Sequence, residues 1–368
     1  MSRPTQAIID RAALRNNVAQ VRANAPGRRI MAIIKANAYG HGLVRIAQML
    51  SRPSEEQHET KVDAFGVACL EEAERLRGVG IQCPITLLEG VFEPSEYEDA
   101  ARLGLTVVIH HLWQIAALES IRVSVPLSVW LKVDTGMHRL GLPLADTRNA
   151  WDRLSVCRSV RPPIGLMTHF ACADVRSSFM TAHQMASFRG VIAGLEGASC
   201  LANSAAILGH PATHGQWVRP GLMLYGVSPF VDQSAASLGL HPVMQFSSRL
   251  IALRRVRAGE TVGYGGAWVS PVDTMVGTVA VGYADGYPRH APSGTPVLVN
   301  GQRAPLVGRV SMDMLCVDLK DQPNARIGDP VLLWGKDLPV EEIATAAGTI
   351  PYELLCHIAP RVAVQEQN

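Results

Sequence analysis

The feature that most limits how this chain can fold is an alternation of short apolar runs with helix-like segments between about residues 30 and 240. The apolar runs lie at 30–34, 64–68, 85–88, 106–109, 127–133, 164–168, 199–202 and 222–225. The helix-like segments lie at 43–50, 71–77, 96–103, 113–119, 145–158 and 180–194. Strands that are apolar on both faces indicate a parallel sheet that helices cover on both sides. Eight such units favour a closed (β/α)8 barrel over an open sheet.

The pattern changes after about residue 240. Runs typical of strands lie at 248–254, 274–281, 296–299, 314–318 and 330–333, separated by Gly, Pro and Asp. This spacing predicts a small, mostly antiparallel β domain, followed by short helices at 338–349 and 352–358. We therefore expect a barrel domain at 1–240 and a β domain at 241–368. An arrangement in which the first ten residues or so pair with the β domain stays open.

Composition excludes several classes of protein. The chain has 368 residues, 48% of them hydrophobic and 18% charged, with a net charge of +2 and no basic block. Nucleic acid and anionic membranes are therefore not expected as partners. The N-terminus lacks the apolar stretch of a signal peptide, which predicts a cytoplasmic protein. Seven cysteines without a C-x-x-C pair predict free buried thiols, and twelve scattered histidines predict no metal site. The polar stretch 52–61 is expected to be an exposed loop.

Polar residues stand next to the apolar runs in five of the eight units. They are Lys35, Lys132, Asp134, His169, Asn203, Ser204 and Arg219. Because chemistry in such barrels takes place at the carboxyl ends of the strands, these side chains are expected to meet at one mouth. A lysine held in apolar surroundings loses its proton more easily and then attacks carbonyl groups. By position alone, a Lys35 that reaches into solvent is an equal alternative.

The motif around Lys35 favours the reactive lysine. The stretch 32–42 reads AIIKANAYGHG and resembles the cofactor-lysine motif of the alanine racemase family, whose members use pyridoxal 5′-phosphate (PLP). Further motifs similar to those of the family follow in order along nearly the whole chain. They are LKVDTGMHRLG at 131–141, THFA at 168–171, ANSAA at 202–206, VRPGLMLYG at 218–226, VGYG at 262–265, VGYADGYPR at 281–289, GRVSMD at 308–313 and YELLC at 352–356.

The resemblance implies a PLP-dependent isomerase that interconverts L-alanine and D-alanine, either for peptidoglycan precursors or in alanine catabolism. Racemisation removes the Cα proton from one face and returns one to the other, so the protein must supply two acid/base groups. The family pattern assigns these roles to Lys35, which also carries the cofactor, and to Tyr264. It also implies that His169 and Arg219 lower the pKa of Tyr264 through a hydrogen-bond chain. Without the resemblance, Tyr264 would be interpreted as a turn residue between glycines.

The resemblance also assigns the cofactor contacts. Arg219 is expected to face the PLP ring nitrogen, and because a guanidinium has no acceptor atom it disfavours a proton there. The ring is then a weaker electron sink, which suits racemisation. The other residues expected to contact the cofactor are Tyr39, Arg139, His169, Asn203, Ser204, Gly221, Leu222 and Tyr352. Asn203 and Ser204 also fit the start of a helix, and both roles are compatible.

Further residues are assigned to the substrate. Arg139 and the backbone amide of Met312 are expected to bind its carboxylate. Lys132 is expected to carry a carbamate that orients Arg139, and an unmodified lysine beside a bound anion is the alternative. The residues that match the family's entry corridor are Asp174, Tyr283, Arg289 and Arg309. Surface salt bridges are the alternative role for this last group, above all for Arg289.

The family pattern implies a two-fold homodimer with shared sites. In it, the β domain of one subunit delivers Tyr264 and Met312 to the barrel of the other. One departure concerns the C-terminus, which reads PRVAV at 360–364 where the family has an Arg-Val-Pro motif, and this leaves the C-terminal contacts open.

Other functions remain as alternatives at this point. They are a racemase of serine or lysine, a decarboxylase of basic amino acids, a PLP carrier without catalysis, and a cofactor-free Schiff-base aldolase. Arg219 argues against the decarboxylase, because that chemistry needs an acidic partner for the ring nitrogen. The β domain argues against a PLP carrier without catalysis, because such a carrier would consist of the barrel and lack the β domain. A visible absorbance band of lysine-bound PLP would distinguish a PLP enzyme from the cofactor-free aldolase, which would show no such band.

Overall fold

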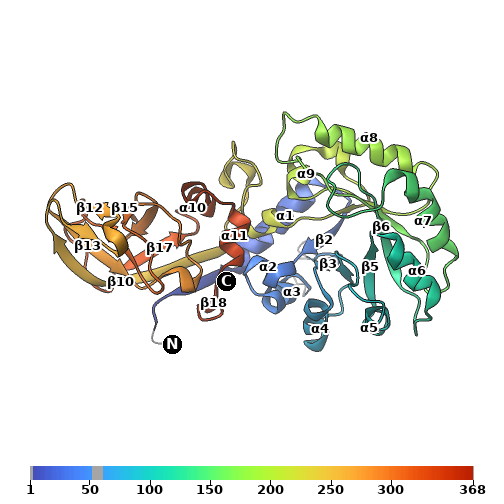
Figure 1. Ribbon diagram of the computed structural model, residues 1–368, viewed down its shortest axis with the longest axis horizontal. Helices are drawn as coiled ribbons and strands as arrows, with labels where there is room; N and C mark the ends of the chain where they lie inside the picture. The colour runs from blue at the N-terminus through green and yellow to red at the C-terminus, as the bar shows by residue number, and fades with distance from the viewer. Residues whose placement is uncertain (1–2, 52–60, 368) are drawn as a thin grey trace.

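The computed structural model describes residues 3–51 and 61–367, which form a parallel barrel and a second, eight-stranded β sheet that lie end to end (Figure 1). Eight parallel strands close the barrel in chain order. They are β2 (Arg29–Ile33), β3 (Ala64–Val67), β4 (Ile85–Leu87), β5 (Leu105–Ile109), β6 (Ser128–Lys132), β7 (Gly165–Met167), β8 (Ser199–Cys200) and β9 (Trp217–Val218). Strand β9 pairs with β2, with Val218 opposite Ile30. The predicted fold class, a (β/α)8 barrel with a mostly antiparallel β region after it, is confirmed.

Helices cover the outside of the barrel (Figure 1). They are α1 (Arg11–Asn24), α3 (Leu43–Ser51), α4 (Leu70–Gly78), α5 (Glu96–Arg102), α6 (Leu112–Ser120), α7 (Leu144–Val156), α8 (Met180–Ile192) and α9 (Ser204–Gly209). Each buries one face, as α3 does with Leu43, Ile46, Ala47 and Leu50, which recur at the spacing of helical turns. Among the residues described, no helix combines the length and the apolar character that crossing a membrane requires.

One predicted barrel strand is wrong. The run at 222–225 forms the 3-10 turn η3 (Leu222–Tyr225), and the eighth strand is the two-residue β9. All four residues of η3 are buried, and the turn packs against α1. The apolar run therefore reflects burial, and a run this short does not distinguish a strand from a buried turn. As a result, Arg219 directly follows the eighth strand, which places it with the other polar residues at the strand ends.

The second part is an eight-stranded sheet that takes in both ends of the described chain. Its strands, in spatial order, are β13 (Thr274–Val279), β16 (Leu315–Asp318), β15 (Gln302–Val307), β14 (Pro296–Val299), β17 (Pro330–Trp334), β10 (Met244–Val256), β1 (Gln6–Asp10) and β18 (Ala363–Gln367). Strand β1 pairs antiparallel with β10 and parallel with β18. A separate small hairpin joins β11 (Thr261–Val262) to β12 (Trp268–Val269).

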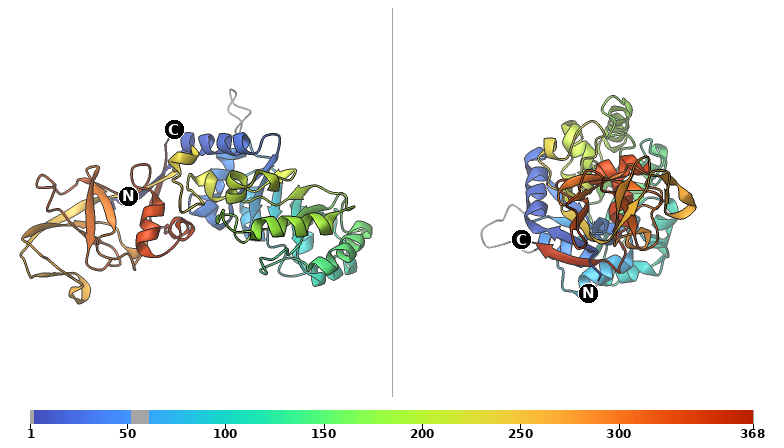
Figure 2. Two further views of the ribbon diagram at one scale, coloured as in Figure 1. Left: turned by 90° about the horizontal axis from the view of Figure 1, so that it is seen from above. Right: turned by 90° about the vertical axis from the view of Figure 1, so that its left-hand side faces the viewer.

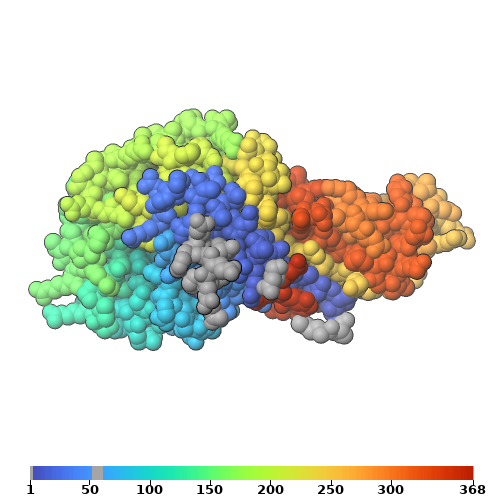
Figure 3. Space-filling view, turned by 180° about the vertical axis from the view of Figure 1, so that it is seen from behind, coloured from blue at the N-terminus to red at the C-terminus, as the bar shows by residue number. Residues whose placement is uncertain are grey.

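Two short helices lie between the sheet and the barrel, α10 (Val340–Ala347) and α11 (Pro351–Cys356) (Figures 1 and 2). One apolar cluster runs from the barrel through this junction into the sheet, and it includes Phe246 and Trp334, whose rings lie 4.6 Å apart. The surface shows the two parts as a broad and a narrow lobe (Figure 3). The junction is thus a packed core, which fixes the direction in which the sheet extends.

The cysteines and the polar stretch 52–61 agree with the sequence predictions only in part. All seven cysteines are free thiols, as predicted, but Cys356 is exposed whereas Cys157 and Cys200 are buried. Cys356 lies in the last turn of α11, whose buried face is made by Leu354 and Leu355. Of the polar stretch 52–61, residues 52–60 lie outside the described part of the chain, and Lys61 is exposed.

Candidate active site

A cavity of about 720 Å³ opens at the carboxyl ends of the barrel strands. Its polar lining consists of Lys35, Tyr39, Glu89, Lys132, Arg139, His169, Asn203, Ser204, Arg219, Gly221 and Tyr352, and its apolar lining of Ile33, Leu88, Leu140, Met167, Leu222 and Ile350. The structure therefore brings together all the residues that the sequence assigned to the cofactor. They come from loops that follow β2, β6, β7, β8 and β9, and from α11.

Lys35 stands at the start of an unusual backbone segment, α2 (Lys35–Tyr39). The next four residues have positive φ angles, namely Ala36 (53°), Asn37 (53°), Ala38 (55°) and Tyr39 (52°). A left-handed turn costs L-residues roughly 1–2 kcal/mol each, so surrounding contacts must hold it. Asn37 contributes one, because its Oδ1 accepts from the amide of Leu43 at 2.9 Å. Strain of this kind is typical of segments that hold a functional group in place.

Two tyrosine hydroxyls reach the cavity beside a glycine. The Tyr39 ring stacks on Tyr225 at 4.8 Å and lies 5.8 Å from the ring of Tyr352. Burial raises the pKa of the Tyr352 hydroxyl to about 12 and that of Tyr39 further, so both stay protonated donors. A Cβ at Gly221 would lie 2.7 Å from Tyr39 Oη, so this approach requires glycine.

Ser204 and Asn203 organise the loop after β8. Asn203 precedes α9, and its side chain accepts from the amide of Ala206 at 3.0 Å, which confirms the predicted helix start. Ser204 Oγ accepts from the amide of Gly221 at 2.9 Å and from that of Met223 at 3.2 Å. The Ser204 hydroxyl therefore connects the loop after β8 to the loop after β9.

Arg219 is buried, and both terminal nitrogens of its guanidinium are engaged. Nη1 donates to the Cys200 carbonyl at 2.6 Å and to its Sγ at 3.1 Å. Nη2 donates to the carbonyls of Thr168 (2.7 Å) and Leu201 (3.1 Å). Nη2 also lies 3.2 Å from Nδ1 of His169. Because arginine can only donate, His169 Nδ1 accepts, and the proton of the neutral ring is on Nε2.

Positive charge dominates the cavity. Burial, reinforced by the charges of Arg219, Arg139 and Lys35, lowers the pKa of Lys132 to about 8. Burial and the same cations hold the pKa of His169 well below its usual range, so this imidazole is neutral at pH 7. Glu89 is the one carboxylate in the lining, and its Oε1 lies 3.5 Å from Lys35 Nζ. Such a cavity favours anionic ligands.

Glu89 was not singled out in the sequence. It follows strand β4 almost directly, in the same way that Lys35 and His169 follow theirs. The rule that chemistry gathers at the carboxyl ends of barrel strands would have selected it. The motifs at the ends of five other barrel strands carried a family resemblance, and the stretch around Glu89 did not.

The β-sheet residues assigned to the site do not line this cavity. Tyr264, in the turn η5 (Tyr264–Gly266), is 67% exposed, and Met312 is 53% exposed. Three further candidates, Tyr283, Arg289 and Arg309, are exposed on the same part of the molecule, and Asp174 is exposed on a barrel loop. Within residues 3–51 and 61–367 Arg289 forms no salt bridge. One chain thus places Lys35 in the cavity and presents Tyr264 elsewhere.

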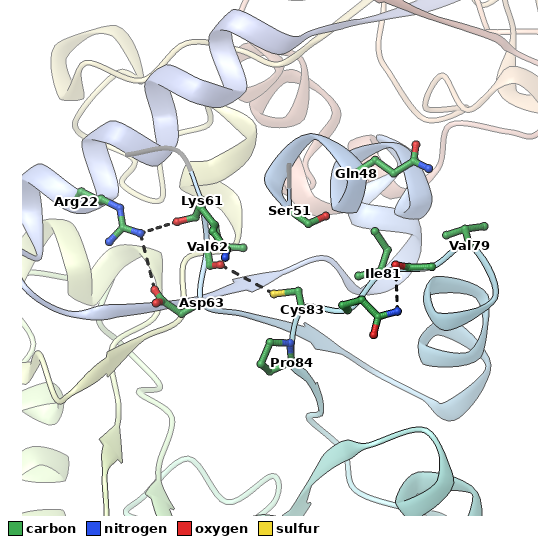
Figure 4. Close-up of a pocket in the computed structure, with 12 residues that line it drawn as sticks. Arg22, Gln48, Ser51, Lys61, Val62, Asp63, Val79, Ile81, Cys83 and Pro84 are labelled. Atoms are coloured by element: carbon green, nitrogen blue, oxygen red, sulfur yellow. Dashed lines mark hydrogen bonds and ion pairs between the residues drawn. The ribbon is translucent and has the colours of Figure 1, made fainter. Parts of the chain in front are cut away.

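A second cavity, of about 680 Å³, lies at the amino ends of β3 and β4 (Figure 4). Arg22 Nη2 lies 3.8 Å from Asp63 Oδ2 there, and the Cys83 thiol faces the Val62 carbonyl at 4.0 Å. Ser51 and Lys61, which line it, border the residues that the structure leaves undescribed. None of the residues predicted to bind the cofactor lines it, so the barrel mouth is the candidate active site.

Comparison with known proteins places this geometry in a family. The model of the alanine racemase N-terminal domain matches residues 9–229, and that of the C-terminal domain matches residues 243–365. The chain belongs to the alanine racemase family. The resemblance found in the sequence is therefore confirmed, and family membership makes the protein an isomerase.

Individual members of the alanine racemase family are similar along the whole chain. The alanine racemase of Nitrosococcus oceani is 51% identical over 358 residues, which cover 97% of this chain and 98% of that one. A crystal structure of the biosynthetic alanine racemase from Pseudomonas aeruginosa has a TM-score of 0.94, with 49% identity and 100% of both chains covered. The alanine racemase structure from Acinetobacter baumannii has a TM-score of 0.91, with 36% identity and 99% and 100% coverage.

Proposed function

We propose that this member of the alanine racemase family interconverts L-alanine and D-alanine with PLP bound to Lys35, and with Lys35 and Tyr264 as the two acid/base groups. Similarity to alanine racemases over the whole chain supports the reaction. The observation that carries the residue assignment is that Lys35 and Arg219 share one cavity whose lining is rich in cations.

The side chains at the barrel mouth fit PLP. Lys35 supplies the amine for a Schiff base, and the protonated hydroxyls of Tyr39 and Tyr352 are donors suited to a phosphate. We assign Ser204, Asn203, Gly221 and Leu222 to the same phosphate end, and Arg219 to the ring nitrogen. When bound, PLP withdraws electrons from the substrate Cα, so that its proton leaves more readily.

Arg219 is suited to its role because it is fixed and always charged. Its terminal nitrogens are held by three backbone carbonyls, by Cys200 Sγ and by His169. A guanidinium keeps its proton at any working pH and offers no acceptor atom. It therefore keeps a ligand nitrogen beside it unprotonated, which limits how far negative charge is drawn away from Cα.

The two faces of the substrate need one proton carrier each. Lys35 Nζ would exchange a proton on one face, which the family pattern gives as the D-face. The phenolic oxygen of Tyr264 would exchange a proton on the other, although a free tyrosine has a pKa of about 10. The cationic Arg219, with His169 as a neutral relay, would favour the phenolate if Tyr264 came close.

Tyr264 is exposed and does not line the cavity that holds Lys35 in the same chain, so the proposal requires a second subunit. In a two-fold homodimer the partner subunit's Tyr264 and the partner subunit's Met312 would complete the barrel mouth. We assign the amide of Met312, together with Arg139, to the substrate carboxylate. Asp174, Tyr283, Arg289 and Arg309 are assigned to the entry corridor, where bulky and charged side chains would exclude large substrates.

Lys132 is proposed to carry a carbamate. With a pKa of about 8, a useful fraction of its amine is neutral near pH 7.5. The neutral nitrogen would attack carbon dioxide, forming an N–C bond and releasing a proton to solvent. The product is an anion among the cations Arg139, Arg219 and Lys35, where it would orient Arg139.

The test is Cα–H exchange. The purified protein with added PLP is incubated in D₂O with separate amino acids, including alanine, serine and lysine, and both deuterium at Cα and the enantiomers formed are measured. We expect alanine to react fastest, with deuterium in both enantiomers, and Lys35→Ala to be inactive. A faster reaction with serine or lysine, or exchange without inversion, would contradict the proposal.

A further inference from the structure

Glu72, in the first turn of α4, binds two backbone amides that lie far apart in the sequence. Its Oε1 accepts from the amide of Ala36 at 2.7 Å, and its Oε2 accepts from the amide of Ala68 at 2.8 Å. Ala36 directly follows Lys35, and Ala68 directly follows strand β3. One carboxylate therefore ties the carboxyl ends of two neighbouring barrel strands together at the mouth of the cavity.

The contact with Ala36 falls where the backbone most needs support. Ala36 is the first residue of the left-handed segment, with φ of 53°, and it is exposed. A left-handed alanine is intrinsically unfavourable, so the segment depends on outside contacts. A hydrogen bond to an ionised acceptor is stronger than one between neutral groups. Loss of this contact would allow Ala36 to relax, and Lys35 would turn with it because the two share a peptide bond.

We infer that Glu72 is a positioning residue for Lys35. It fixes the peptide that follows the lysine, and so it sets the direction in which Nζ enters the cavity. The inference rests on the proposed function, in which Lys35 holds PLP. Glu72 does not line the cavity, so its effect passes through the Ala36 peptide.

Helix capping is the competing explanation. Glu72 is the third residue of α4, and its contact with Ala68 is of the kind a first-turn glutamate makes with the amides before its helix. The two roles use different oxygens of the same carboxylate. Capping alone predicts a lower melting temperature and an unchanged Lys35. Positioning predicts a less reactive Lys35, whatever happens to the melting temperature.

The experiment compares attachment of PLP to the apoenzyme in three variants and the wild type. Glu72→Ala removes both contacts, and Glu72→Gln leaves one acceptor oxygen for two amides. Glu71→Gln is the matched control, because Glu71 is the exposed neighbour in the same turn and binds neither amide. Attachment is followed by visible absorbance and by the mass of the Lys35 peptide after borohydride reduction, with melting temperatures measured alongside.

We expect Glu72→Ala to slow attachment by about tenfold or more, the size of effect that loss of one charge-assisted hydrogen bond produces. Glu72→Gln should lie between this variant and the wild type, and Glu71→Gln should match the wild type. The KM for alanine should change little, because the contact lies outside the substrate cavity.

A second-site change separates positioning from capping. Glycine adopts positive φ without the Cβ penalty, so Ala36→Gly lowers the cost of the left-handed turn. Glu72→Ala combined with Ala36→Gly should therefore regain a substantial part of the lost rate. A capping defect would not be repaired, because Ala36 is not part of α4.

The outcomes are distinct. Attachment in Glu72→Ala at the wild-type rate, or a double variant as slow as Glu72→Ala, overturns the inference and leaves the proposed function intact. A wild-type protein that attaches no PLP at Lys35 overturns the proposed function, and the inference falls with it.

Discussion

Arg361 donates from Nε to Oδ1 of Asp285 at 2.7 Å, and this contact ties the C-terminal segment to the turn η6 (Tyr283–Asp285). Arg3 donates to the other oxygen of Asp285, also at 2.7 Å, and the Asp285 side chain is fully buried. Arg361 also reaches Asp313, next to Met312, at 2.7 Å. Both ends of the chain thus hold the two loops that present Tyr283 and Met312.

This contact answers the question raised by the missing Arg-Val-Pro motif. The arginine is present as Arg361, and the departure is confined to Ala363. Ala363 begins strand β18 and pairs with Gln6 of β1. A proline at this position would have no amide to donate, so the alanine is compatible with the observed pairing.

Arg361→Gln should lower the free energy of unfolding, although Arg361 makes no contact with the cavity at the barrel mouth. The change leaves the buried Asp285 carboxylate with one charged partner, at a cost of about 1–3 kcal/mol once the partial exposure of Arg361 is allowed for. Urea unfolding at fixed protein concentration measures this. Arg303→Gln, which breaks the exposed pair with Glu342, is the control and should cost less than about 1 kcal/mol. Equal effects of the two changes would count against a special role for Asp285.

The contacts of Asp285 with Arg361 and Arg3 should also make the stability of the protein depend on pH. Burial by itself would raise the pKa of Asp285, but hydrogen bonds from Arg361 and Arg3 outweigh it and the pKa is lowered. A lowered folded-state pKa stabilises the fold above the unfolded value of about 3.9, and this stability is lost as the pH falls through the folded value. The melting-temperature gap between wild type and Asp285→Asn should therefore be constant above pH 5 and shrink below pH 4. A gap that widens in acid would contradict this.

The sequence predicted the barrel well because each strand is a short apolar run bounded by polar residues. The same regularity predicts that Lys35, His169 and Arg219 meet at one mouth of the barrel. It failed for η3, because burial alone makes Leu222–Tyr225 apolar. Nothing local predicts the left-handed turn after Lys35, since it contains no glycine before Gly40. Its cause is tertiary, namely contacts such as that from Glu72, which lies 36 residues further on.

Gly40→Ala should damage both stability and cofactor binding. Gly40 has φ of 79°, and an added Cβ would lie 1.9 Å from the carbonyl oxygen of Leu355 in α11. Helix α11 would have to move, and Tyr352 with it. Gly27→Ala is a matched control, because its φ is 71° but the space around it is open. We expect about 1 kcal/mol for the control and roughly 2–5 kcal/mol for Gly40→Ala by thermal or urea unfolding. The affinity for PLP should fall in Gly40→Ala and stay unchanged in Gly27→Ala.

Lys132→Met should stabilise the apoenzyme in buffer free of carbon dioxide. The lowered pKa of about 8 means that the folded state disfavours the charged amine. The penalty is complete below pH 8 and disappears above the unfolded value of about 10.4. The variant should therefore melt above the wild type at pH 7, with a gap that closes by about pH 10.5. Added bicarbonate should raise the wild-type melting temperature at pH 8 and leave the variant unchanged. A bicarbonate effect of equal size in both proteins would argue against a carbamate on Lys132.

A mixed dimer tests whether two chains share each site. Lys35→Ala and Tyr264→Phe chains with different affinity tags are co-expressed, and the heterodimer is isolated through both tags. Each parental homodimer should be nearly inactive, with the loss in Tyr264→Phe of the order of 10²–10⁴-fold expected for removal of an acid/base group. PLP absorbance should persist in Tyr264→Phe, because Lys35 is intact.

In the heterodimer, one barrel keeps its lysine and receives the partner subunit's Tyr264, whereas the other site lacks both groups. One of two sites should therefore work, which gives about half of the wild-type rate per dimer. If each site instead drew both groups from one chain, neither half of the heterodimer would be complete, and the rate would stay at the parental level. A monomer with full activity would exclude sharing altogether. The exposed position of Tyr264 in a single chain, against the enclosed position of Arg219, favours the shared arrangement.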